Sequence, residues 1–267
     1  MQINKCEGGA KCHMDITQVG DATLICGDCM KVLPTLEDER VRLILADPPF
    51  GTTSNTWDKV LDMDAIWPHI RRVRTPAAAT LLFAQQPFAS DLIRGNRREY
   101  RYEWIYCKRN PVGFFWSHHM PLRAHELILT FYARLPTYNP QMQSGGKPYV
   151  RRRRKGSTTP NYHRNDAYTT ISDGRRYPTD VLSGFEMQRG AHPTQKPTDL
   201  LAYLIRTYTD PGDMVLDFCM GSGSTCVAAL EEGRRAIGIE LDRGYYDTAV
   251  RRCREALKRK DRQNYHD

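Results

Sequence analysis

The chain has 267 residues, a formal net charge of +8 and a pI of about 9.1, which allows one substantial α/β core with an inserted or appended module. The positive charge favours a polyanionic partner, although many basic proteins share it. No apolar stretch is long enough for a signal peptide or a transmembrane helix, so we expect no membrane partner and a cytoplasmic protein.

Eight cysteines do not form the pattern of a secreted disulfide scaffold, and a reducing cytosol keeps them as thiols. One cluster could hold zinc, because Cys6, Cys12, His13, Cys26 and Cys29 include a C-x-x-C step. No second close pair completes such a site, so we expect no metal.

Short runs rich in aliphatic and β-branched residues alternate with helix-like stretches along the chain. In chain order, these runs span 22–28, 41–50, 78–84, 102–108, 125–133, 214–224 and 234–242. Unbroken apolar strands alternating with helices indicate a sheet that is buried on both faces, so we predict an α/β fold with a doubly wound, mostly parallel, Rossmann-like sheet. Ligands of such a fold bind at the carboxyl ends of the strands.

The second of these runs ends in Asp47, Pro48, Pro49 and Phe50. Consecutive prolines remove two backbone donors and stiffen the turn, which leaves carbonyl oxygens free to accept hydrogen bonds. The Asp47 side chain and the Pro48 carbonyl could accept both hydrogens of a base's exocyclic amino group while Phe50 stacks on the base, which must first leave the duplex. The other interpretation is a strand-ending turn without chemistry.

Two later segments could contact nucleic acid. Phe114, Phe115 and Trp116 follow another expected strand and could sandwich a base, or they could pack in the core. Between residues 135 and 190 the strand and helix rhythm disappears, which indicates an insertion. Arginine contacts phosphates and guanine edges, although a solvated charged loop is the alternative. The expected DNA-binding residues are Arg151, Arg152, Arg153, Arg154, Lys155, Arg175 and Arg176.

Near the C-terminus a strand ends at Asp217, a turn with Gly221 and Gly223 follows, and a second strand ends at Glu240. This is half of a nucleotide-binding βαβ unit, in which glycines let the backbone approach a ligand and Glu240 can accept hydrogen bonds from a ribose diol. A dinucleotide is the rival ligand, but Cys226 stands where its fingerprint wants a third small residue, and its pyrophosphate would lie near the Asp217 carboxylate. The cationic S-adenosylmethionine fits an acidic strand end better.

The order of these motifs is similar to that of one family. DPPF, then HPTQKP, then FCMGSGST resemble the amino-methyltransferases of DNA in their β group, where the catalytic motif precedes the target-recognition region and the cofactor motif comes last. The resemblance spans roughly Leu24 to Val250. It implies that Asp47 to Phe50 are catalytic and that S-adenosylmethionine is the cofactor. The implied cofactor-binding residues are Asp28, Asp47, Lys196, Thr198, Asp217, Phe218, Gly221, Gly223, Ser224 and Glu240.

Some of these residues have a second interpretation. In the family the segment of Lys196 and Thr198 borders the methionine end of the cofactor and could bind its carboxylate, but it could also be an ordinary capped helix. Asp28 lies where the family contacts the adenine ring of the cofactor, or it caps the next helix. The family more often has tyrosine where Phe50 stands, so stacking is kept and a hydroxyl hydrogen bond is lost.

The resemblance divides the chain into four expected segments. They are an N-terminal tail (1–20), the catalytic half of a methyltransferase core (21–134), a target-recognition insertion (135–190), and the cofactor-binding half with a basic C-terminal helix (191–267).

The expected function is that of a site-specific DNA adenine-N6 methyltransferase acting on double-stranded DNA. Cytosine-N4 is the alternative, and adenine is favoured because Asp47 opens the catalytic motif, where serine is commoner in the cytosine enzymes. Cytosine-C5 chemistry uses a cysteine that usually follows proline, and no Pro-Cys pair occurs. An RNA or protein-amide methyltransferase and an inactive DNA-binding regulator are less favoured. The family often forms dimers, so we expect a homodimer, while the recognition sequence and any restriction endonuclease partner stay open.

Overall fold

The computed structural model describes residues 14–51, 60–153, 167–185 and 195–264. The chain forms two compact units, of which the first comprises Met1–Asn139 with Asp180–Asp267 and the second comprises Pro140–Thr179. The second unit falls within the insertion expected between residues 135 and 190. Among the helices that the structure describes, none is long and apolar enough to cross a membrane.

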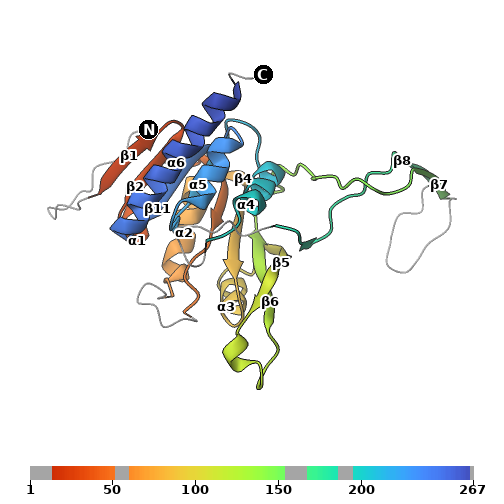
Figure 1. Ribbon diagram of the computed structural model, residues 1–267, viewed down its shortest axis with the longest axis horizontal. Coiled ribbons are helices and arrows are strands. Elements are labelled where there is room, and N and C mark those ends of the chain that lie inside the picture. The colour runs from red at the N-terminus through yellow and green to blue at the C-terminus, as the bar shows by residue number, and fades with distance from the viewer. Residues whose placement is uncertain (1–13, 52–59, 154–166, 186–194, 265–267) are drawn as a thin grey trace. The chain divides into compact units, whose positions relative to one another are not determined.

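In its described part, the first unit is built on a nine-stranded sheet in the order β1-β2-β11-β10-β3-β4-β6-β5-β9 (Figure 1). The parallel centre consists of β2 (Ala22–Cys26), β11 (Arg235–Glu240), β10 (Met214–Asp217), β3 (Val41–Ala46) and β4 (Arg74–Ala84). Next to β4 lie the antiparallel β6 (Arg123–Phe131), then β5 (Tyr100–Val112) and the short β9 (Val181–Leu182). The prediction of a doubly wound, mostly parallel sheet is confirmed.

Helices cover both faces of this sheet. One face packs against α1 (Cys29–Val32), the 3₁₀ helix η1 (Leu33–Thr35), α2 (Met63–Val73) and α3 (Phe88–Gly95). The other face packs against α4 (Thr198–Tyr208), α5 (Ser224–Glu231) and α6 (Arg243–Asn264). In β3, Leu43 and Leu45 join the core under α4 to α6, whereas Ile44 and Ala46 join the core under α1 to α3. Successive strand residues point to opposite faces, so a strand covered on both sides must be apolar throughout.

The outer strand β1 (Asp15–Val19) pairs antiparallel with β2 and lies in the segment expected to be an N-terminal tail. Its sequence DITQV is largely exposed, and Val19 is its one buried residue. Because this edge strand contributes little to the core, its sequence has no apolar run from which the strand could be predicted.

The described part of the second unit contains an antiparallel pair, β7 (Tyr149–Arg153) and β8 (Tyr168–Ser172). Arg176 supports this pair from inside the unit, since its guanidinium lies 5.0 Å from the Tyr149 ring centroid and donates to the Lys147 carbonyl at 2.8 Å. Gly146 leaves room for that guanidinium, because a Cβ there would lie 2.6 Å from the guanidinium carbon of Arg176.

Candidate active site

Two acidic residues meet at the carboxyl edge of the central strands. Asp47 directly follows β3, Asp217 ends β10, and the two strands are parallel neighbours with Leu216 opposite Ile44. The helix that follows β3 covers one face of the sheet and the helix that follows β10 covers the other, so a crevice is expected between these strands. Burial raises the pKa of Asp217 to about 7, and the negative charge of Asp47 contributes to the rise.

The glycine turn after β10 exposes backbone to this edge. Gly221 has φ +51°, and a Cβ built on it would meet no described atom within 4 Å, so its backbone faces open space. Its amide donates to Glu240 Oε2 at 2.8 Å, and the amide of Asp242 donates to Oε1 at 2.8 Å. Glu240 thereby orients the turn, while each of its oxygens retains capacity for a further hydrogen bond.

Side chains of helix α6 contact the glycine turn and fix its conformation. Arg252 donates to the Ser222 carbonyl at 2.6 Å, to the Ser222 hydroxyl at 2.8 Å and to the Ser224 hydroxyl at 3.0 Å. Gly223 permits the close approach of this helix, because a Cβ there would lie 2.7 Å from the Cβ of Ala249. The turn is therefore preorganised by contacts that do not occupy its open side.

The departure at Cys226 has a structural explanation. A Cβ on Gly238 in β11 would lie 2.6 Å from the sulfur of Cys226. The close packing of helix on strand, which a third small residue on the helix provides in dinucleotide folds, is provided here by a glycine on the facing strand.

Asp47 belongs to a row of alternating charges, which we call the charge chain. Asp47 Oδ2 lies 2.7 Å from Lys196 Nζ, which lies 3.1 Å from Glu126 Oε2, and Glu126 Oε1 lies 2.6 Å from Lys108 Nζ. Two carboxylates and two ammonium groups compensate one another in a largely buried place. The other oxygen of Asp47, Oδ1, is buried and has no hydrogen-bond partner among the described residues.

The charge chain sets the protonation of its members. Burial raises the pKa of Asp47, the ammonium of Lys196 opposes the rise, and the carboxylate of Glu126 adds to it. Burial acts in the same direction on Glu126, but Lys196 and Lys108 lower its pKa to about 2. Burial disfavours the charged form of Lys196, yet the two carboxylates raise its pKa above the ordinary value. Lys196 and Glu126 are therefore ionised at neutral pH.

Phe50 lies beside the same ammonium. Its ring centroid is 5.7 Å from Lys196 Nζ and 5.8 Å from the ring centroid of Phe88. The ring is half-buried, so one part of it is anchored and another part is accessible for stacking. The structure thus brings together the predicted residues Asp47 to Phe50, Asp217 and the glycine turn.

Other predicted site residues have different neighbours. Asp28 accepts from the Met30 amide at 2.9 Å and caps α1, which agrees with the capping alternative. Phe218 is 1% exposed and packs in the core under α1 to α3. Lys196 is paired within the charge chain, so a cofactor carboxylate would have to compete with Asp47 and Glu126 for its ammonium.

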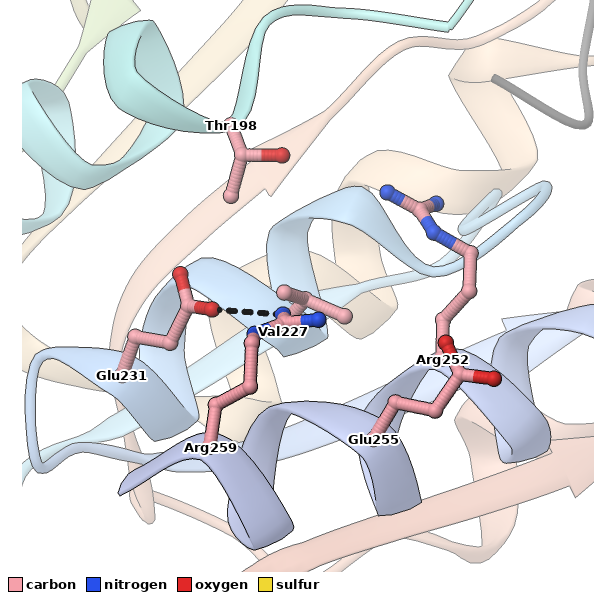
Figure 2. Close-up of a pocket in the computed structure, with 6 residues that line it drawn as sticks. All are labelled: Thr198, Val227, Glu231, Arg252, Glu255 and Arg259. Carbon is pink, nitrogen blue, oxygen red and sulfur yellow. Dashed lines mark hydrogen bonds and ion pairs between the residues drawn. The ribbon is translucent and has the colours of Figure 1, made fainter. Parts of the chain in front are cut away.

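Thr198 lines a cavity of about 310 Å³ between α4, α5 and α6 (Figure 2). Its other lining residues are Val227, Glu231, Arg252, Glu255 and Arg259. The Glu231–Arg259 ion pair of 2.9 Å bridges α5 and α6 at this cavity. The cavity opens among the helices that cover one face of the sheet, whereas ligands of such folds bind at the carboxyl edge of the strands. We therefore do not assign the cofactor to it.

The predicted nucleic-acid contacts fall into distinct environments. Arg151 and Arg152 are exposed on β7, whereas Arg175 pairs with Asp173 at 2.7 Å. Arg154 and Lys155 lie outside the described residues. Phe114, Phe115 and Trp116 are exposed, so of their two interpretations the one that packs them in the core is wrong.

Glu126 is a site residue that sequence reasoning missed. A signal existed, because an acidic residue inside the otherwise apolar run HELILTF must find a partner once the strand is buried. For the zinc alternative, Cys6, Cys12 and His13 lie outside the described residues, and among the described ones no group of three or more ligands could hold a metal.

Comparison with known proteins gives one family. The family described as DNA methylase, N6/N4 type, matches residues 41–251. The type II methyltransferase M2.DpnII of Streptococcus pneumoniae is 26% identical over 86% of this chain and 88% of its own length. M.HinfI of Haemophilus influenzae is 27% identical over 87% of this chain and 68% of its own length. The methylase YubD of Escherichia coli K12 is 49% identical over 27% of this chain, which spans 32% of that relative.

Solved structures share the fold. The M1.HpyAVI–SAM complex superposes with a TM-score of 0.59 at 21% identity, covering 86% of this chain and 98% of that one. The cytosine-N4-specific PvuII DNA methyltransferase superposes with a TM-score of 0.63 at 15% identity, covering 86% of both chains.

Proposed function

The chain belongs to the N6/N4 DNA methylase family, and on that premise we propose that it methylates the N6 amino nitrogen of adenine in double-stranded DNA with S-adenosylmethionine as methyl donor. One observation carries the proposal. The buried Oδ1 of Asp47, without a partner among the described residues, lies at the strand edge that also carries the glycine turn. A buried acceptor of this kind needs a donor, and an exocyclic amino group supplies one.

The cofactor fits the residues around the glycine turn. S-adenosylmethionine supplies an electrophilic methyl group on a cationic sulfonium. The open side of Gly221 gives a ligand access to the backbone, and Glu240 can accept from ribose hydroxyls through its remaining lone pairs. Asp217, whose pKa burial raises to about 7, becomes a full anion when a cationic ligand lies near it. Asp28, Phe218, Gly223 and Ser224 support this surface in the proposal.

Asp47 carries the catalytic role. Its Oδ1 accepts one amino hydrogen and the carbonyl of Pro48 accepts the other, so the nitrogen can become pyramidal and its lone pair is less delocalised into the ring. The carboxylate also offsets the positive charge that builds on that nitrogen. Phe50 stacks on the base, and Pro49 stiffens the turn. Lys196 holds Oδ2, which leaves Oδ1 directed at the substrate. No covalent bond to the enzyme is needed, because the N–C bond would form as the S–C bond of the methyl donor breaks. Asp47 Oδ1 would then accept the proton that the methylated nitrogen loses and pass it to solvent.

Adenine is favoured over cytosine because a carboxylate, which carries a full charge, opens the catalytic motif and because a purine gains more from stacking on Phe50. The assay incubates unmethylated genomic DNA with the protein and labelled S-adenosylmethionine, digests the DNA to nucleosides and separates them with mass detection. We expect label in N6-methyldeoxyadenosine. Label in N4-methyldeoxycytidine would overturn the base assignment and keep the mechanism, and label in 5-methyldeoxycytidine would refute both.

The charge chain leads to a prediction about the pH dependence of turnover. Turnover needs ionised Asp47, so it declines as the pH falls through the pKa of that residue. Lys196→Gln removes the ammonium that lowers this pKa and should move the acid limb of the kcat profile to higher pH. Glu126→Gln removes a carboxylate that raises it and should move the limb to lower pH.

Both variants lose a partner of a buried pair and should unfold at lower temperature than the wild type. Melting curves across the same pH range therefore accompany the kcat profiles, so that unfolding is not mistaken for titration. Two shifts in the same direction would contradict the roles assigned to Lys196 and Glu126.

A further inference from the structure

Strands β5 and β6 continue beyond the edge of the sheet. The last residue of β4, Ala84, pairs with Leu127 in β6, while β5 and β6 go on pairing through Cys107–His125 to Val112–Arg123. β5 runs in the same direction as β3 and β4. The hairpin therefore extends from the carboxyl edge, the edge at which Asp47 lies, and Figure 1 shows its end standing clear of α3.

Three aromatic rings form the end of this hairpin, which we call the hairpin tip (Phe114, Phe115 and Trp116). Within the described part of the chain, the side chains of Phe114, Phe115 and Trp116 are 77%, 95% and 61% exposed. The tip is an ordered 3₁₀ turn, η2 (Phe114–Trp116), that follows Gly113 at φ +96°. Amides of Trp116 and Ser117 donate to the carbonyls of Gly113 and Phe114 at 2.9 and 3.0 Å. A turn that presents three large rings to solvent marks an interaction surface.

The charges of the residues around the hairpin tip indicate which kind of partner it binds. No Asp or Glu occurs from residue 105 to residue 125, a segment that holds Lys108, Arg109, Arg123 and three histidines. A surface with aromatic rings, basic side chains and no carboxylate along its sequence matches a nucleic acid, which offers base faces for stacking and phosphates for the exposed Arg109 and Arg123. An apolar protein partner would gain nothing from the basic flanks.

The base of the hairpin connects the tip to the catalytic residue. Glu126 on β6 pairs with Tyr106 on β5 and directly precedes Leu127, the partner of the last residue of β4. Lys108 lies two residues beyond Tyr106 on β5, and both Lys108 and Glu126 belong to the charge chain that ends at Asp47. The tip is thus carried on a two-stranded arm that is anchored by ion pairs beside the site where a base has to be presented.

We propose that the hairpin tip stacks into duplex DNA next to the target base and occupies the space that this base leaves when it turns into the active site. The proposal rests on the proposed function. Extracting a base leaves a gap in the stack, and aromatic rings in that gap replace the lost stacking. This lowers the free energy of the extracted state relative to the paired one.

The first test is independent of methyl transfer. Among the described tryptophans Trp67 and Trp104 are buried, whereas Trp116 is exposed. Mixed-sequence unmethylated DNA should quench the tryptophan emission of the wild type, and Trp116→Phe, which keeps a stacking ring, should abolish most of that quenching while its affinity for DNA stays within about twofold. Unchanged quenching in Trp116→Phe would overturn the proposal.

The second test uses a triple variant with Phe114, Phe115 and Trp116 replaced by alanine, and a synthetic duplex that carries a site methylated by the wild type. On the paired duplex turnover should fall by roughly 10- to 100-fold. On a duplex whose target base faces an abasic position, extraction costs less, and most of the turnover should return. Ile16→Ala, which shortens an exposed side chain on β1, is the control and should behave as the wild type on both.

The outcomes separate this proposal from the function on which it rests. A wild type that quenches with DNA but methylates none of it would refute the proposed function and retain the contact between tip and duplex. Full turnover of the triple variant on the paired duplex, or an equal loss on both duplexes, would overturn the role of the tip. A change of oligomeric mass in light scattering without a change in turnover would instead make the tip a contact between copies of this chain.

Discussion

Asp47→Ala is expected to lower the turnover number by at least about 10²- to 10³-fold, the cost of losing one preorganised charge-stabilising group. The variant removes the acceptor for the amino hydrogen and the charge that offsets the developing cation. It also frees Lys196 Nζ from its 2.7 Å contact, which places an ammonium where a cationic transition state forms. Single-turnover kinetics with labelled S-adenosylmethionine measure the chemical step directly.

Two further variants test separately the charge of Asp47 and the specificity of the effect. Asp47→Asn keeps an oxygen acceptor without the charge, so it should retain more activity than the alanine variant if hydrogen bonding contributes separately. Asp91→Ala removes an exposed carboxylate on α3 and should leave turnover unchanged. DNA affinity should persist in all three variants. Near-wild-type turnover of Asp47→Ala would remove the basis of the catalytic assignment.

Neutralising the five residues Arg151 to Lys155 should weaken binding to DNA by on the order of 100-fold at moderate salt, with little change in cofactor affinity. Each lost phosphate contact lowers the slope of log K against log salt by about 0.9. Arg151 and Arg152 are exposed on β7, so their guanidinium groups face solvent, from which a phosphate would approach. Fluorescence anisotropy of a labelled duplex at several salt concentrations gives both quantities.

Arg175→Gln is the matched control within the same unit. Arg175 already pairs with Asp173 at 2.7 Å, and a phosphate would have to displace that carboxylate, so the slope should change much less. If the slope stays the same after all five residues are neutralised, the run is a solvated loop and its assignment to DNA binding is wrong.

The parts of the site that the sequence predicts well are those with local signals. Asp47 and Asp217 each close an apolar run, and a strand end in a doubly wound sheet is where chemistry lies. The glycine turn is equally local, because Gly221 and Gly223 both adopt positive φ. These signals need no knowledge of which strands are neighbours.

The charge chain could not be predicted in the same way. Lys108 and Glu126 reach Asp47 through an antiparallel hairpin and through Lys196, so their partnership depends on long-range pairing. Sequence reasoning also placed the hairpin tip in the core or over the base, because aromatic residues after a strand are usually buried. The extension of β5 and β6 beyond β4 excludes the core position, and no local pattern reports the lengths of neighbouring strands.

The central position of β10 and β11 has a consequence for biosynthesis. These strands lie between β2 and β3 in the sheet but are translated long after them. At ordinary elongation rates β2 and β3 wait on the order of ten seconds or more for their neighbours, with apolar edges that invite wrong pairing. The nascent chain therefore carries Asp47 without the glycine turn beside it until β10 and the residues after it have emerged from the ribosome. If the proposed function is correct, a truncated translation product that ends before β10 lacks the glycine turn and should not modify a base.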